Sequence, residues 1–235
     1  MLAEYLSYNQ TLRVLSVKSY SISSYDKLRP IIGALCYNSS LFELNLNCCS
    51  FGIDYFEAIA DMLRRNRTLR KFHMIDCSVS NYDPRPASWK RKRKGESSII
   101  SQWSRTLAEN KALEELTLDL RWIKPEECSS LFKALASNKY LTKVTIDTFP
   151  DEQVAHICRA LRDTHVPERF FVGKHHLSGD TIAVLSDCKE ISRICLENWR
   201  PTEVESLHTT LCVLPTCDHV KFPFSCSPRG SIHRK

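Results

Sequence analysis

The sequence predicts an α/β fold: a curved solenoid in which one short strand and one helix repeat along the chain and stack on their neighbours. Three observations lead to this prediction. A pattern of apolar residues headed by asparagine recurs along the chain, and an amphipathic helical stripe precedes most of its copies. The composition, with 43% hydrophobic and 26% charged residues, is that of a chain able to bury a core.

The expected strands follow five fragments that share one pattern: NQTLRVLSV, NSSLFELNL, NRTLRKFHM, NKALEELTL and NKYLTKVTI. In each, an apolar anchor stands three residues after the asparagine, and apolar residues follow three and five positions later. The anchors are Leu12, Leu41, Leu69, Leu113 and Leu141, separated by 29, 28, 44 and 28 residues in the numbering. Apolar and polar positions alternate after the anchor, as in a short strand. Weaker copies at Pro167, Ile191 and Cys217 predict about eight repeats.

The expected helices lie upstream of the anchors, where apolar residues recur at minus 13, minus 10 and minus 6. These offsets place the side chains on one stripe of a helix. The six sets are Leu28, Ile31, Leu35; Phe56, Ile59, Leu63; Ile100, Trp103, Leu107; Cys128, Leu131, Leu135; Val154, Ile157, Leu161; and Val204, Leu207, Leu211. The recurrent asparagine ends each helix, where we expect a cap with left-handed backbone geometry.

The pattern L-x-x-L-x-L-x-x-C, present from Leu41 to Cys49 and, in the form L-x-x-F-x-M-x-x-C, from Leu69 to Cys77, resembles leucine-rich repeats of the ribonuclease-inhibitor type. The repeat length is also similar to that of the C-terminal arrays of NOD-like receptors. The likeness is close over 1–78 and 99–147 and loose afterwards. It implies a parallel sheet on the concave face, helices on the convex face and protein binding by the concave face. It transfers no functional residue, because the matched motif is only the structural frame.

The sequence departs from this family in two ways. Tyr20, Arg121, Phe149, His175 and Trp199 stand where the motif has Cys or Asn, and no nucleotide-binding or death-fold domain precedes the repeats. The chain opens in mid-repeat, with Leu2 and Leu6 at helix positions. We therefore expect either a fragment of a larger receptor or an end that a partner covers.

The candidate binding residues lie between the buried strand positions and should face the concave groove. They are Lys71, His73, Glu115, Asp119, Lys143, Asp147, Arg169, Phe171, Arg193 and Glu197. Together with Lys18, Glu43 and Lys221, which are expected on the same face, the predicted groove carries six basic and five acidic residues. A nucleic-acid groove would carry one sign. We expect an unidentified protein partner, with Phe171, Arg169 and Arg193 as candidate hot spots. A solvated sheet face is the alternative for each.

The expected organisation is repeats 1–3 in 1–78, a disordered basic insertion in 79–98, repeats 4–8 in 99–222 and a flexible basic tail in 223–235. The insertion contains Lys90, Arg91, Lys92, Arg93 and Lys94. The formal charge is +6, and the insertion and the tail account for the excess, which leaves the solenoid near −1. The basic run is either a solvated loop or a nuclear-import or anion-contacting segment. The alternative function is therefore a nuclear, nucleic-acid-associated protein that uses this loop and the tail.

Motifs for a catalytic zinc, a phosphate-binding loop or an esterase serine are missing from the sequence. Cys212, Cys217, His219 and Cys226 match no compact zinc signature. We therefore expect no enzyme, no cofactor and no metal. The sequence has no apolar run long enough for a membrane span and no signal peptide, and its eleven scattered cysteines are typical of free thiols. We expect a cytoplasmic protein, with the nucleus as the second compartment. The N-x-S/T triplets at Asn9, Asn38 and Asn66 are expected by-products of the repeat.

Overall fold

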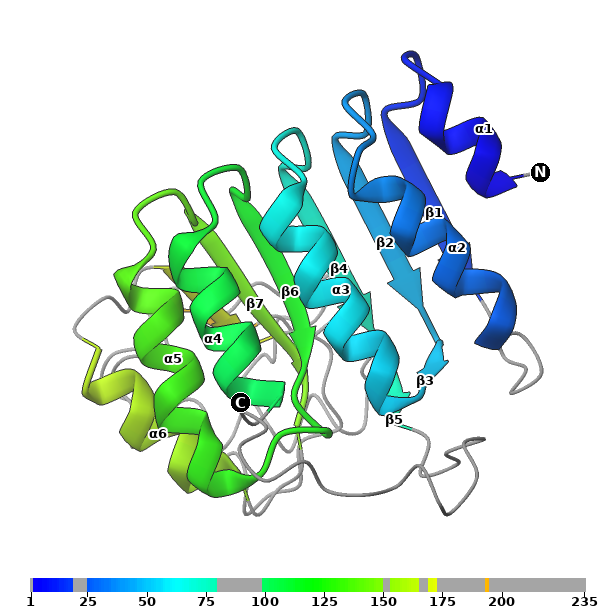
Figure 1. Ribbon diagram of the computed structural model, residues 1–235. Coiled ribbons are helices and arrows are strands. Elements are labelled where there is room, and N and C mark those ends of the chain that lie inside the picture. Colours follow the sequence, from blue (N-terminus) through cyan, green and yellow to red (C-terminus); the bar gives the residue numbers. More distant parts are fainter. Residues whose placement is uncertain are drawn as a thin grey trace, which may run out of the picture.

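The computed structural model describes residues 2–18, 25–79, 99–149, 153–164, 169–172 and 193–194. Within these residues, seven parallel strands form one sheet in the order β1-β2-β4-β6-β7-β8-β9 (Figure 1). Their bounds are β1 Val14–Lys18, β2 Glu43–Asn47, β4 Lys71–Ile75, β6 Glu115–Asp119, β7 Lys143–Thr148, β8 Phe170–Val172 and β9 Arg193–Ile194. A second, two-stranded sheet pairs β3 Ser50–Phe51 with β5 Ser78–Val79. Each of the first seven predicted repeats thus contributes one strand to the main sheet.

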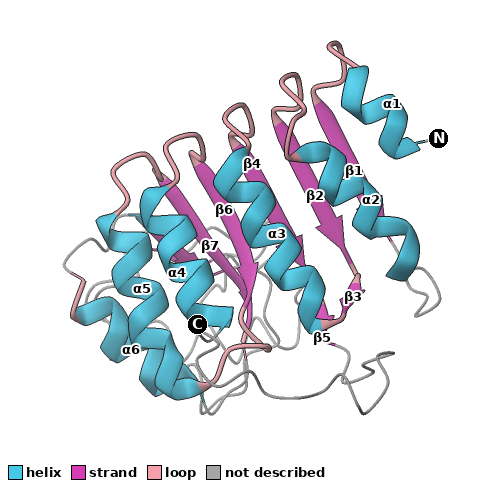
Figure 2. Ribbon diagram, viewed as in Figure 1, coloured by secondary structure: helices cyan, strands magenta, loops and turns pink. Residues whose placement is uncertain are grey.

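The helices lie together on one face of this sheet (Figure 2). They are α1 Leu2–Tyr8, α2 Tyr25–Leu35, α3 Ile53–Arg65, α4 Ile99–Glu109, α5 Cys128–Ser137 and α6 Val154–Arg162, with a short 3-10 turn, η3, over Pro125–Glu127. Strand and helix alternate along the chain, which confirms the leucine-rich-repeat solenoid. The eighth repeat, the tail and all of the insertion except Val79 lie outside the described residues.

The core follows the predicted periodicity. In β2 and β4, Leu44, Leu46, Phe72 and Met74 are fully buried and alternate with half-buried neighbours. The described side chains of the helix stripes are also buried, except that Ile31 is partly exposed and Ile32 is buried in its place. The reason is that positions i+3 and i+4 both border the stripe of a helix. The described cysteines are free thiols, as expected.

The recurrent asparagines do not have the predicted left-handed geometry. The backbone is extended at Asn66 (φ −68°, ψ 135°) and at Asn138 (φ −74°, ψ 120°). Left-handed backbone occurs instead after the strands, at Cys48 and Asp76, each with φ 52°. The asparagine is therefore needed for its side chain and not for its backbone conformation.

These side chains join successive repeats in what we call the asparagine ladder: Asn9, Asn38, Asn66, Asn110 and Asn138. In each, Oδ1 accepts hydrogen bonds from the backbone N–H groups two and three residues later. In the last four, Nδ2 donates to backbone carbonyls of the preceding repeat. Asn38 and Asn66 are 4% and 3% exposed, so these two triplets are structural, as predicted.

Among the helices that the structure describes, none combines the length and the apolar character that a membrane crossing requires.

Candidate protein-binding surface

The candidate site lies on the sheet face opposite the helices, where one row of side chains alternates in charge. The parallel register aligns Glu43 with Lys71, Lys71 with Glu115, and Glu115 with Lys143. Equivalent positions of successive repeats meet side by side because the strands are parallel and in register. We call Lys71, Glu115 and Lys143 the charge ladder.

Glu115 is the shared member of the charge ladder. Its Oε1 lies 2.5 Å from Lys71 Nζ, and its Oε2 lies 3.8 Å from Lys143 Nζ. The hydrogen bond from Lys71 lowers the pKa of Glu115 and raises the pKa of Lys71. The three side chains are 31%, 26% and 49% exposed, so each pair contributes only about 0–1 kcal/mol to stability. The ion pairs hold charges of both signs in fixed positions on this face of the sheet.

A second row runs beside the first and brings an aromatic ring to the charge ladder. His73, Thr117, Thr145, Phe171 and Arg193 are successive partners in the register. His73 Nδ1 and Thr117 Oγ1 are 2.7 Å apart, and burial lowers the pKa of His73, which favours the neutral ring. Lys143 Nζ lies 5.7 Å from the centroid of the Phe171 ring, within the range of a cation–π contact.

The remaining predicted site residues are Arg169, Arg193 and Glu197, of which the structure describes the side chain of Arg169 alone. Arg169 Nη1 donates to the carbonyl of Asn138 at 2.6 Å, so part of its guanidinium holds the turn of the preceding repeat. Arg193 belongs to β9, and its side chain is outside the described part of the structure. Glu197 and the basic run Lys90–Lys94 lie outside the described residues. The hot-spot role predicted for Arg169, Phe171 and Arg193 remains a prediction.

Asp119 and Asp147 do not line the groove, contrary to the prediction. They are 0% and 6% exposed, and Thr117 in the same strand as Asp119 is also buried, at 7%. The register shifts between Leu118 and Asp119 and pairs Asp119 with Thr148. The alternation of burial therefore does not hold in β6, where all residues from Leu116 to Asp119 are buried. Desolvation raises the pKa of both carboxyl groups.

Arg121 explains how a carboxylate is tolerated at this depth. Its Nη2 lies 2.6 Å from Asp119 Oδ2 and 2.9 Å from Asp76 Oδ1, and it also donates to the carbonyl of Cys77 at 3.4 Å. Asp147 Oδ2 accepts the N–H of Asp76 at 3.3 Å. The only sequence signal for this cluster was the arginine at a Cys or Asn position of the repeat. The cluster is structural, and among the described residues no group of His, Cys, Asp and Glu side chains could hold a metal ion.

Comparison with known proteins supports the fold. No protein-family model and no curated protein matches the sequence. Among solved structures, the tropomodulin C-terminal domain of Caenorhabditis elegans is similar, with 12% identity, a TM-score of 0.50, and coverage of 69% of this chain and 90% of that domain. A structure of leiomodin-1 actin-binding site 2 has 12% identity and a TM-score of 0.41, over 88% of this chain and 95% of that one. The first likeness shows a shared fold, and the second is too low to carry an argument.

Proposed function

We propose that this chain is a non-catalytic protein-interaction module that binds a protein partner through its concave sheet face. The carrying observation is the charge ladder of Lys71, Glu115 and Lys143 with the Phe171 ring beside it. A partially exposed aromatic ring among oriented charges is a combination that protein interfaces favour, because the ring supplies contact area and the charges supply specificity.

The alternation of charge is the reason for preferring a protein to a nucleic acid on this face. Glu115 stands between two lysines, so the surface presents donors and acceptors in turn. A phosphate backbone would meet Glu115 as a like charge, and nucleic-acid affinity depends on neutralising several phosphates together. A polar protein surface can offer the opposite sign at each position.

The same proposal includes the type of repeat, the cellular compartment and the role of the chain. The array is of the ribonuclease-inhibitor type and resembles those of NOD-like receptors, on the strength of the repeat length and of Cys49 and Cys77 at the motif position. It acts without a cofactor, in the cytoplasm, as a scaffold, adaptor or sensor array. The nuclear, nucleic-acid-associated alternative depends on Lys90–Lys94 and the tail, and no described residue favours it.

Affinity capture from native cells with matched variants tests the proposal. The double substitution Lys143→Ala, Phe171→Ala removes one lysine and one ring from the site. The control Tyr37→Ala, Lys133→Ala removes an exposed ring and an exposed lysine from the α2 end and from α5. A protein recovered with the wild type and the control, but lost with the site variant, is the expected result. Recovery of the same proteins with all three chains would refute the concave-face assignment.

A further inference from the structure

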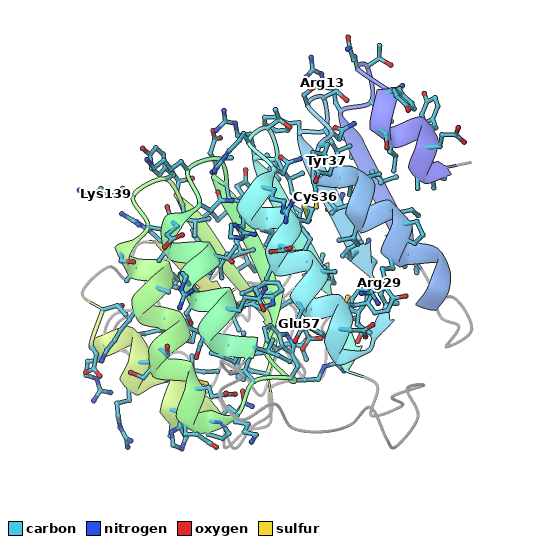
Figure 3. All side chains as sticks on the ribbon, viewed as in Figure 1. Arg13, Arg29, Cys36, Tyr37, Glu57 and Lys139 are labelled. Atoms are coloured by element: carbon cyan, nitrogen blue, oxygen red, sulfur yellow. The ribbon has the colours of Figure 1, made fainter. Side chains whose placement is uncertain are left out.

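A second charged surface lies on another edge of the molecule, where each helix turns into the next strand. These turns stand side by side along one edge, and Figure 3 shows Arg13 and Lys139 extending from it. The residue after each ladder asparagine is displayed there. In the turns that lead into β4, β6 and β7 this residue is a cation: Arg67, Lys111 and Lys139. We call these three residues the cationic row.

Within the described part of the chain, no acidic side chain pairs with the cationic row. All three side chains are exposed, and none makes a salt bridge or hydrogen bond to another described residue. The nearby carboxylates already have arginine neighbours. Glu114 Oε1 lies 3.7 Å from Arg70 Nε. The pKa of Arg64 is raised mainly by its hydrogen bond to Asp61 and, to a smaller extent, by the charge of Glu109.

The backbone beneath the cationic row is held rigidly by the asparagine ladder. Arg67, Lys111 and Lys139 each follow an asparagine that is at most 3% exposed: Asn66, Asn110 and Asn138. Asn138 Nδ2 donates to the carbonyls of Leu107 and Asn110 at 2.6 and 2.7 Å, which links one turn to the turn before it. The cations therefore start from fixed positions in consecutive repeats, and binding has only side-chain rotation to restrict.

From this geometry we propose that the cationic row is a docking site for an extended acidic segment of a protein partner. Neighbouring strands are about 4.8 Å apart, and same-face side chains of an extended peptide are roughly 7 Å apart, a difference that long lysine and arginine side chains bridge. Tyr140, 49% exposed, stands beside Lys139 and offers an apolar contact at one end. This surface is separate from the charge ladder, so the inference goes beyond the proposed function.

Charge decides between an acidic peptide and a nucleic acid. Three cations suit two or three carboxylates, whereas the affinity for a polyanion grows with the number of phosphates that are neutralised. Outside the insertion and the tail the chain is near −1 in formal charge, so the solenoid has no broad positive field to attract a nucleic acid.

The test is fluorescence anisotropy with labelled hexaglutamate as the probe and the full chain as the receptor, at low and at physiological ionic strength. The row variant carries Arg67→Gln, Lys111→Gln and Lys139→Gln. The control carries Arg105→Gln, Lys133→Gln and Arg159→Gln. It removes three exposed cations from the outer helical face whose side chains pair with no other described residue. Circular dichroism verifies that both variants are folded.

We expect the row variant to bind hexaglutamate about tenfold more weakly than the wild type, the sum of three exposed ion pairs, with the control unchanged. Equal weakening in both variants, or none in the row variant, would overturn the proposal. So would tighter binding of a short oligothymidylate that depends on the row, because it would assign the surface to nucleic acid. The variant Lys143→Ala, Phe171→Ala should leave hexaglutamate binding intact, which separates this test from that of the concave face.

Discussion

Replacing Asn66 with alanine would remove a side chain that connects two successive repeats. Its Oδ1 accepts the N–H groups of Thr68 and Leu69 at 2.9 and 2.7 Å, and its Nδ2 donates to the carbonyls of Leu35 and Asn38 at 2.7 and 3.0 Å. Asn66 is 3% exposed, so solvent does not replace these bonds unless the turn opens. Four backbone groups would each lose a hydrogen bond in one substitution, and of these the carbonyl of Asn38 keeps a bond from Thr68 Oγ1 at 3.3 Å.

The expected cost follows from those four bonds. Each contributes about 1 kcal/mol net, and a buried group without a partner costs at least as much, so Asn66→Ala should lower the free energy of unfolding by roughly 4 kcal/mol. That is a large part of the roughly 5–15 kcal/mol that stabilises a typical domain. Asn66→Asp keeps the acceptor but sets a carboxylate against two carbonyls, so it should be equally destabilising at neutral pH. Because those carbonyls raise the pKa of the new carboxyl group, its penalty should shrink as the pH falls through that pKa.

Equilibrium urea unfolding followed by far-ultraviolet circular dichroism measures these losses. The matched control is Asn45→Ala on the open face of the sheet. There the amide Nδ2 bonds only to side chains, Ser16 Oγ at 3.1 Å and Glu43 Oε1 at 2.8 Å. We expect the control to lose less than about 1 kcal/mol. If Asn66→Ala also lost less than about 1 kcal/mol, the structural role of the asparagine ladder would be refuted.

Two further predictions concern the titratable groups. Arg121→Gln leaves the buried Asp119 carboxylate without its cation and should cost about 2–3 kcal/mol at neutral pH, discounted because Arg121 is 38% exposed. The pKa of Asp119, already raised by burial, should rise further, so the loss of stability should shrink on acidification. Adding Asp119→Asn should restore part of the stability. If urea unfolding shows no such recovery, Arg121 does not act by neutralising Asp119. Burial lowers the pKa of His73, so the unfolded chain takes up a proton first as the pH falls below about 6.5, and the native state loses stability there. His73→Gln should flatten this part of the stability–pH profile, and an unchanged slope between pH 7.5 and 5 would count against it.

Most of the frame could be predicted because it arises from local periodicity. Leu44, Leu46, Phe72 and Met74 are buried since side chains alternate along a strand, and Phe56, Ile59 and Leu63 are buried since they share a helical stripe. Both rules operate within one repeat, and the sequence repeats them often enough to reveal the period. The same rule placed Lys71, Glu115 and Lys143 on one face of the sheet, whereas their ion pairs were seen only in the structure.

Other features depend on contacts between repeats, and these the sequence does not display. Asp119 and Asp147 are buried, although by alternation alone they should have lined the groove, and the register shifts after Leu118. Arg121 appeared as a departure from the motif, whereas in the structure it neutralises Asp119 and Asp76. The bond from Arg169 to the carbonyl of Asn138 joins residues of different repeats.

The sequence by itself determined the solenoid, its period and the buried positions of the described repeats. Only the tertiary structure decided that the asparagines bond from repeat to repeat, which acidic residues are buried, and which cations have no partner among the described residues. The physical reason is that periodic burial is set by side-chain direction within one element. Hydrogen bonding and ion pairing depend instead on distances between elements about one repeat apart in the chain.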